Sequence, residues 1–171
     1  MHAMLRFLFP RLTAQPARGA GLFEAVTHEA RQPHWYVEGE VPDSLDGRFA
    51  VLATVSALVL VRLESGADSD DAAGVALTER FVAVMEAEHR ELGLGDPALG
   101  RKVRKLVSAL GRRVELWRSA VADGEFTDAT RQSLDLDGSD DGLEHNSRAL
   151  QDLWTRLEET ATADVAEGIF A

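Results

Sequence analysis

Residues 49–61 read FAVLATVSALVLV, thirteen consecutive residues without a charge. A buried β-strand rarely exceeds about eight residues, so the length of this stretch favours a helix. Because it is apolar on every side, we expect this helix to lie at the centre of the protein. Asp43 or Ser44 is placed to cap its first turn, and the helix should continue to about Glu64. The stretch is shorter than the roughly twenty residues that a membrane span requires.

Helical periodicity recurs along the rest of the chain, and no segment alternates as an exposed strand would. Prolines and glycine-rich loops separate the segments, and Gly93 is placed to end the third of them. The helices are expected at about residues 21–31, 44–64, 73–92, 96–121, 127–134 and 146–165, with an acidic loop at 135–142. The sequence therefore predicts an all-α, single-domain bundle of five to six helices around the central one, covering residues 20–171 after a flexible segment at 1–19.

The helix that starts near residue 96 has the clearest pattern. Asp96 is placed to cap it, and Pro97 occupies the first turn, where no backbone N–H is needed. Its inward stripe consists of Leu99, Val103, Leu106, Leu110, Val114, Trp117 and Val121. Gly111 lies within this helix, which indicates either that another element packs closely against it or that the helix simply tolerates a glycine. The last helix is expected to point Leu150, Leu153, Trp154, Leu157 and Ala161 inward.

Composition excludes several classes of function. The chain of 171 residues has no cysteine, which excludes disulfides and thiol chemistry. A net charge of −11 disfavours DNA binding, because phosphates are repelled. The apolar start, Met1 to Leu12, is interrupted by Arg6 and Pro10 and does not fit a signal peptide. We expect a cytoplasmic protein, with contact between this start and the inner membrane as an alternative.

Clusters that could carry chemistry each have a simpler explanation. Asp137, Ser139 and Asp141 resemble the start of a calcium loop, but Arg148 replaces the closing glutamate. Glu86 and His89 form half of a di-iron pattern without a second half, so His89 is expected to be partly buried and hydrogen-bonded. His28, Glu29 and His34 match no ligand spacing and are expected on the surface or in loops. With no nucleotide-binding or nucleophile motif, we expect no enzyme, cofactor or metal site.

Charge is concentrated in residues 96–118. This segment has seven basic residues and two acidic ones, Asp96 and Glu115, so its net charge is +5, whereas the net charge of the whole chain is −11. They are Arg101, Lys102, Arg104, Lys105, Arg112, Arg113 and Arg118. The basic side chains are predicted to form the exposed face of this helix. They either pair with Glu86, Glu88 and Glu91 on the preceding helix or bind an acidic protein, ribosomal RNA or anionic headgroups. The residues expected to bind a partner are Arg101, Lys102, Lys105, Arg112 and Arg113.

Three stretches together resemble the ubiquinol–cytochrome c chaperone family. They are ARQPHWY at 30–36 with VPDSLDGRF at 41–49, ELGLGD at 91–96, and Gly111-Arg112 with Trp117. The motif residues are Arg31, Pro33, Tyr36, Pro42, Asp43, Asp46, Gly47, Arg48, Phe49, Gly93, Gly95 and Asp96. The likeness covers residues 20–122 well and the rest loosely. Ser44 stands where the family usually has Thr, and Ala50 where it often has Asp.

The resemblance implies a helical chaperone that assists assembly of the cytochrome bc1 complex. Such mitochondrial proteins, with a small partner, act at the ribosome exit and hold newly made cytochrome b. For a bacterial chain it implies a related, non-catalytic role at the inner membrane. The motif itself has two interpretations, a client contact or a structural one in which Arg31 and Arg48 share Asp43 or Asp46 in a buried network. We favour the structural interpretation. The alternative function is a membrane-peripheral scaffold that uses residues 1–12 and the basic face.

Overall fold

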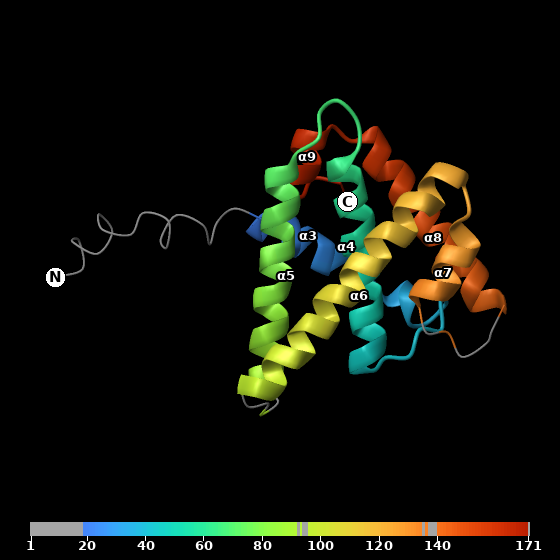
Figure 1. Cartoon of the computed structure of the whole chain (residues 1–171). Coiled ribbons are helices and arrows are strands. Elements are labelled where there is room, and N and C mark those ends of the chain that lie inside the picture. Colours follow the sequence, from blue (N-terminus) through green and yellow to red (C-terminus); the bar gives the residue numbers. More distant parts are fainter. Residues whose placement is uncertain (1–18, 92, 94–95, 135, 137–139, 171) are drawn as a thin grey trace, which may run out of the picture.

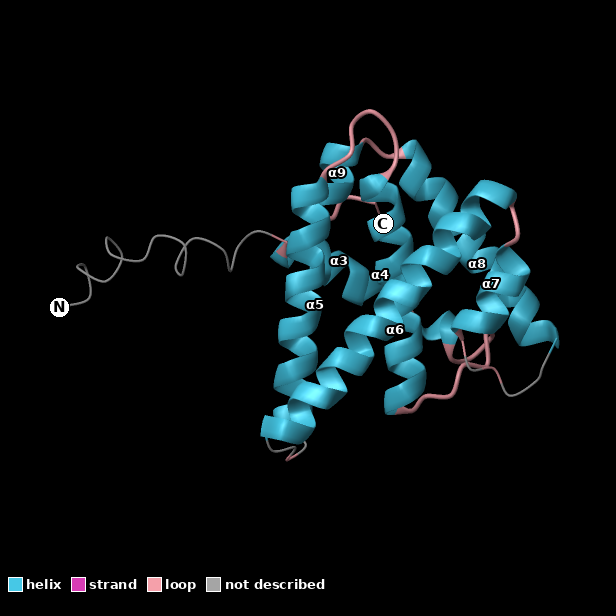
Figure 2. Cartoon of the chain, in the orientation of Figure 1, coloured by secondary structure: helices cyan, strands magenta, loops and turns pink. Residues whose placement is uncertain are grey.

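The structure is a computed structural model that describes residues 19–91, 93, 96–134, 136 and 140–170. Within these residues every regular element is a helix (Figure 2). The elements are α3 (Ala20–Ala30), the 3-10 helix η1 (Pro33–Trp35), α4 (Leu45–Glu64), α5 (Asp71–Glu91), α6 (Asp96–Asp123), α7 (Phe126–Ser133), α8 (Asp140–Glu159) and α9 (Thr162–Ala166). The predicted all-α bundle is therefore confirmed.

Helix α4 lies at the centre, as its uncharged sequence predicts. It packs against each of the other α-helices in the described part of the chain, and Figure 1 shows α6 crossing in front of it. Ser44 is its N-cap, and the Gly47 N–H donates to the Ser44 hydroxyl at 3.1 Å. The two buried hydroxyls, Thr54 and Ser56, donate to carbonyls one turn earlier, so neither is left without a partner in the core.

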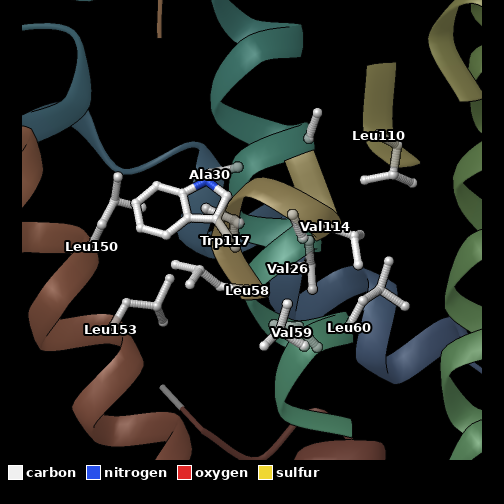
Figure 3. Packing of buried hydrophobic residues seen from close by; sticks show 14 of the residues in the cluster. Val26, Ala30, Leu58, Val59, Leu60, Leu110, Val114, Trp117, Leu150 and Leu153 are labelled. Carbon is white, nitrogen blue, oxygen red and sulfur yellow. The ribbon is translucent and has the colours of Figure 1, made fainter. Parts of the chain in front are cut away.

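Gly93, which follows α5, has a φ of 83°, the left-handed conformation expected there. The predicted stripe of α6 is buried from Leu99 to Trp117, whereas Val121 is only partly buried. Trp117 is fully buried and lies among Leu58, Val114 and Leu150 in the core (Figure 3). Each such side chain contributes roughly 1.5–3 kcal/mol by leaving water. Gly111 has no heavy atom near its missing Cβ, so it is tolerated and is not a site of close packing.

The carboxyl-terminal region differs from the sequence prediction. Helix α8 already begins at Asp140, inside the expected acidic loop, and the expected last helix is broken into α8 and α9. At the break, Arg62 of α4 donates to the carbonyl oxygens of Leu157 and Thr160 and to the Thr162 hydroxyl. An arginine that binds the last carbonyls of a helix stabilises its end. Ala161, expected to point inward, lies exposed between the two helices.

Several expectations fall outside the described residues. These are the flexible segment up to residue 18, with its apolar start, and Gly95, Asp137, Ser139 and the side chain of Asp96. Among the described helices, none combines the length and apolar character needed to cross a membrane.

Candidate functional site

A groove of about 830 Å³ opens between α3, the start of α4, the end of α5 and the start of α6. Six of the motif residues line it: Arg31, Tyr36, Asp43, Asp46, Arg48 and Phe49. The rest of the lining is Phe23, Thr27, Ala30, Leu45, Leu52, Val84, Met85, Glu88, His89, Glu91, Lys102 and Leu106. The groove thus combines apolar walls with charged groups of both signs.

The turn that starts α4 gives one edge of the groove its shape. The Ser44 cap holds Gly47, and a Cβ at Gly47 would lie 2.0 Å from the Pro42 carbonyl oxygen. Only glycine allows the backbone to approach so closely. Ser44 and Gly47 thus shape the turn that follows Pro42, and the structural interpretation of the whole motif stays a prediction.

The buried network expected around Arg48 is wrong. The Arg48 guanidinium donates to Asp43 at 2.6 Å, but both side chains are more than 60% exposed, and Arg31 and Asp46 have no part in the pair. The hydrogen bond from Arg48 holds the pKa of Asp43 below its ordinary value, and Asp43 in turn raises the pKa of Arg48. The sequence could not show that this turn stays on the surface.

The loop carrying the aromatic pair of the motif is tied to α3. The Tyr36 hydroxyl donates to the Ala30 carbonyl oxygen at 2.9 Å, and the Trp35 indole N–H donates to the Glu29 carbonyl oxygen at 2.8 Å. Burial raises the pKa of Tyr36, so the phenol stays protonated and keeps this bond. These two bonds position Tyr36 as a wall of the groove.

The opposite wall comes from α5. His89 is 6% exposed, and its Nδ1 lies 2.8 Å from the Met85 carbonyl oxygen. A carbonyl can only accept, so Nδ1 carries the proton. The predicted burial and hydrogen bond of His89 are confirmed, but its place in the groove was missed. The available signal was the spacing of Met85 and His89 by one helical turn on the face that α6 covers.

Comparison with known proteins agrees with this geometry. The ubiquinol–cytochrome C chaperone family matches residues 38–134, more than half of the chain and most of the groove. The chain belongs to this family. The crystal structure of the Cbp3 homolog from Brucella abortus superposes with a TM-score of 0.76 at 22% identity, covering 98% of this chain and 95% of that chain, which shows the same fold. Among curated proteins, none matches the chain.

In this member of the chaperone family, no ion pair among the described residues joins the basic side of α6 to α5. Arg101, Arg104, Lys105 and Arg112 are exposed, and Lys102 is half-buried at the groove. Among the described residues none of their charged groups lies within 4.0 Å of a carboxylate, so the alternative in which they pair with Glu86, Glu88 and Glu91 is not seen there. Arg118, further along, is paired with Glu64 and Glu115.

Arg113 is placed differently from its expected role as a partner-binding residue. Its side chain turns inward, donates to the Ser133 carbonyl oxygen at 2.8 Å and lies 5.8 Å from the centre of the Phe49 ring. Burial lowers the pKa of Arg113, while its Nε has no hydrogen-bond partner in the described structure. A helical wheel of α6 cannot predict this inward orientation, because the accepting carbonyl group belongs to α7. Arg113 therefore joins α6 to α7 and is not part of the exposed basic face.

The other histidines do not gather with Glu29 as a metal site. His28 contacts Gln32, whereas the His34 Nδ1 lies 3.1 Å from the His145 Nε2. Glu29, expected at the surface, is buried and bonded to Arg156. Across the described residues no three His, Asp or Glu side chains are grouped to hold an ion. Of the calcium-like segment, Asp141 lies in α8, and Arg148 pairs with Glu144.

Proposed function

We propose that this protein is a non-catalytic chaperone for assembly of the cytochrome bc1 complex, and that it binds cytochrome b or an assembly factor through the basic face of α6. The basic face consists of Arg101, Lys102, Lys105 and Arg112, the expected partner-binding residues without Arg113. The family membership supports the assembly role. The hydrophobic cluster from Leu22 to Phe170 supports residues 20–171 acting as one domain.

The observation that carries this assignment is the set of unpaired cations on an acidic protein. Arg101 and Arg112 are eleven residues apart, so the charges extend over roughly 17 Å of helix surface at about 1.5 Å per residue. Four exposed or half-exposed cations without carboxylate neighbours in the described structure contribute little to stability, but they attract an anionic partner and orient it.

Deletion of the gene tests the assembly role. We expect the membranes to lose the haem b and haem c1 absorption of the bc1 complex while its transcripts persist. Complementation with Arg101→Glu, Lys105→Glu and Arg112→Glu together should fail, although the variant folds. Reversal of the exposed Arg80, Arg90 and Arg148 is the matched control and should restore the complex. Normal bc1 spectra in the deletion strain would contradict the proposal.

A second function is a cytoplasmic scaffold peripheral to the inner membrane. It is favoured by Val107, which is 37% exposed among the cations and could enter a headgroup layer beside them. Flotation with vesicles of anionic phospholipid tests it, using the full chain and a chain without residues 1–12. Flotation of both, lost on reversal of the basic face, would support it. Failure of both to float would exclude it.

A further inference from the structure

The groove has an apolar floor that a ligand could cover. Phe23, Met85 and Leu106 line it as buried side chains, and Leu52 is partly buried beside them. At its edge Leu45 is 55% exposed. The volume of about 830 Å³ lies among ordinary ligand pockets, which span roughly 300–1,000 Å³. The floor therefore offers apolar surface to an occupant of more than one side chain.

The rim of the groove carries an excess of negative charge. Four carboxylates and three cations line it, and the ion pair of Arg48 with Asp43 cancels one of each. The remaining carboxylates, all exposed and without a cation within 4.0 Å among the described residues, are Asp46, Glu88 and Glu91. The remaining cations are Arg31 and Lys102, so two minus three leaves a rim charge of −1. A complementary occupant combines apolar side chains with positive charge.

The first twelve residues of this chain have that composition. Eight of them are apolar, Arg6 and Arg11 are basic, and the first acidic residue of the chain is Glu24. The other basic segment, α6, already buries its apolar stripe in the core. Residues 1–12 therefore match both the floor and the rim of the groove.

The chain enters the bundle close to the groove. Gly19 precedes α3, and an ideal Cβ there would lie 3.0 Å from the Ala76 Cβ, so this entry point is where α3 meets α5. Both helices also form walls of the groove. Phe23, the first groove residue of α3, follows about 6 Å further along the helix axis.

The distance to the groove can be bridged. Residues 13–18 span up to about 20 Å when extended, so residue 12 can reach the groove without strain. A connection this short gives a tethered segment an effective concentration on the order of millimolar, which allows even weak contacts to form.

We propose that residues 1–12 dock in the groove of their own chain, with their apolar side chains on the floor and with Arg6 and Arg11 beside Glu88 and Glu91. The inference goes beyond the proposed function, which assigns partner binding to the basic face of α6. Docking makes the segment a competitor of any other apolar, basic ligand of the groove. It also withdraws the segment from contact with a membrane.

A spin label on the segment tests the proposal in the full chain. The chain has no cysteine, so Ala3→Cys provides a single site for a nitroxide. We expect the label to broaden the amide resonances of groove residues on α3, α4 and α5 and to leave those of α8 unchanged. The broadening should persist on dilution, because the contact lies within one chain. The same sample with its nitroxide reduced gives the reference spectrum.

Charge reversal on either side should release the segment. Glu88→Lys with Glu91→Lys should reduce the broadening at least about threefold, because attractive pairs become repulsive. Arg6→Glu with Arg11→Glu should do the same, and it changes no residue of the described helices. The four changes together should restore the contact. Reversal of two exposed carboxylates of α8, Glu158→Lys with Glu159→Lys, is the matched control and should leave the broadening as it is.

Three outcomes would overturn the proposal. Groove resonances that stay sharp in the labelled full chain would mean that the segment does not dock there. Broadening in a mixture of isotope-labelled chain and separate spin-labelled chain, but not within one chain, would assign the groove to the segment of a second copy. Equal losses in the groove variant and the α8 control would mean that the segment follows the general negative charge of the protein. None of these results depends on whether deletion of the gene removes the bc1 complex.

Discussion

The carbonyl oxygen of Pro42 occupies the space that a side chain on Gly47 would need. An ideal Cβ at residue 47 would stand 2.0 Å from that oxygen, while the Gly47 N–H donates to Ser44. The partner in this clash is backbone, which cannot rotate away as the end of a side chain can. The turn that starts the central helix therefore depends on glycine at this position.

We expect Gly47→Ala to lower the free energy of unfolding by about 2 kcal/mol or more, because the turn must distort to admit the methyl group. Gly111→Ala is the matched control, since this exposed helical glycine has open space around it. It should raise stability by roughly 0.5–1 kcal/mol, the helix preference of alanine over glycine. Urea unfolding of both variants gives the comparison. Equal effects of the two substitutions would show that the turn does not require glycine.

Arg113 should behave as a structural residue and not as part of the basic face. Arg113→Met keeps the apolar stem but removes the bond to the Ser133 carbonyl oxygen, and we expect a loss of about 1–2 kcal/mol. The neighbouring exposed Arg112→Met should change stability by no more than about 0.5 kcal/mol. Partner capture should show the reverse order, with Arg112→Met the weaker binder. If Arg113→Met leaves thermal unfolding unchanged, the contact between α6 and α7 does not depend on it.

The sequence predicted those parts of the structure that depend on local pattern. The central helix, the stripe from Leu99 to Trp117 and the stop at Gly93 follow from periodicity and backbone preference, and all are present. Features that depend on distant residues could not be predicted. The inward-turned Arg113 donates to Ser133 of α7, and the donor to the carbonyl groups beside the break at Ala161 is Arg62, almost a hundred residues earlier.

The groove, too, could be predicted only where it depends on local sequence. Its motif edge could be predicted because Pro42, Ser44 and Gly47 are a local turn signal, whereas for its α5 wall the sequence predicted only a partly buried His89. Periodicity places Met85 and His89 on a covered face, but it does not tell a filled interface from one that leaves a cavity. That difference depends on the crossing of α5 and α6, which the side chains of both helices decide together.

The His34–His145 pair should make stability depend on pH. The pKa of His34 lies below its ordinary 6.5, mainly because of burial and secondly because of the neighbouring His145. Arg156 also lowers it, whereas Glu29 and Glu38 raise it by less than the lowering groups together. Between the two pKa values the unfolded chain binds more protons than the folded one, so stability rises with pH. The contribution is complete above about pH 6.5 and is lost as pH falls through the lowered pKa of folded His34.

Thermal unfolding between pH 5 and 8 checks this dependence. His34→Gln should flatten the acidic side of the curve, because glutamine cannot take up a proton. His28→Gln serves as the control, since His28 is exposed and contacts only Gln32, and its curve should follow that of the wild type. A wild-type curve that is already flat from pH 7 to 5 would show that the pair does not resist protonation.

Arg62 should determine whether the end of the chain stays attached to α4. Its guanidinium makes three bonds of 2.7–2.8 Å, to the carbonyl oxygens of Leu157 and Thr160 and to the Thr162 hydroxyl. Arg62→Met would leave these acceptors without their donor, and we expect a loss of about 2–4 kcal/mol. Arg62→Lys should recover only part of it, because a compact ammonium cannot reach three acceptors that a planar fork reaches. Hydrogen exchange should show faster opening of α9 in both variants before the rest of the bundle changes. Uniform exchange across the bundle in Arg62→Met would instead mean that these bonds stabilise the whole core and do not hold its last helix in particular.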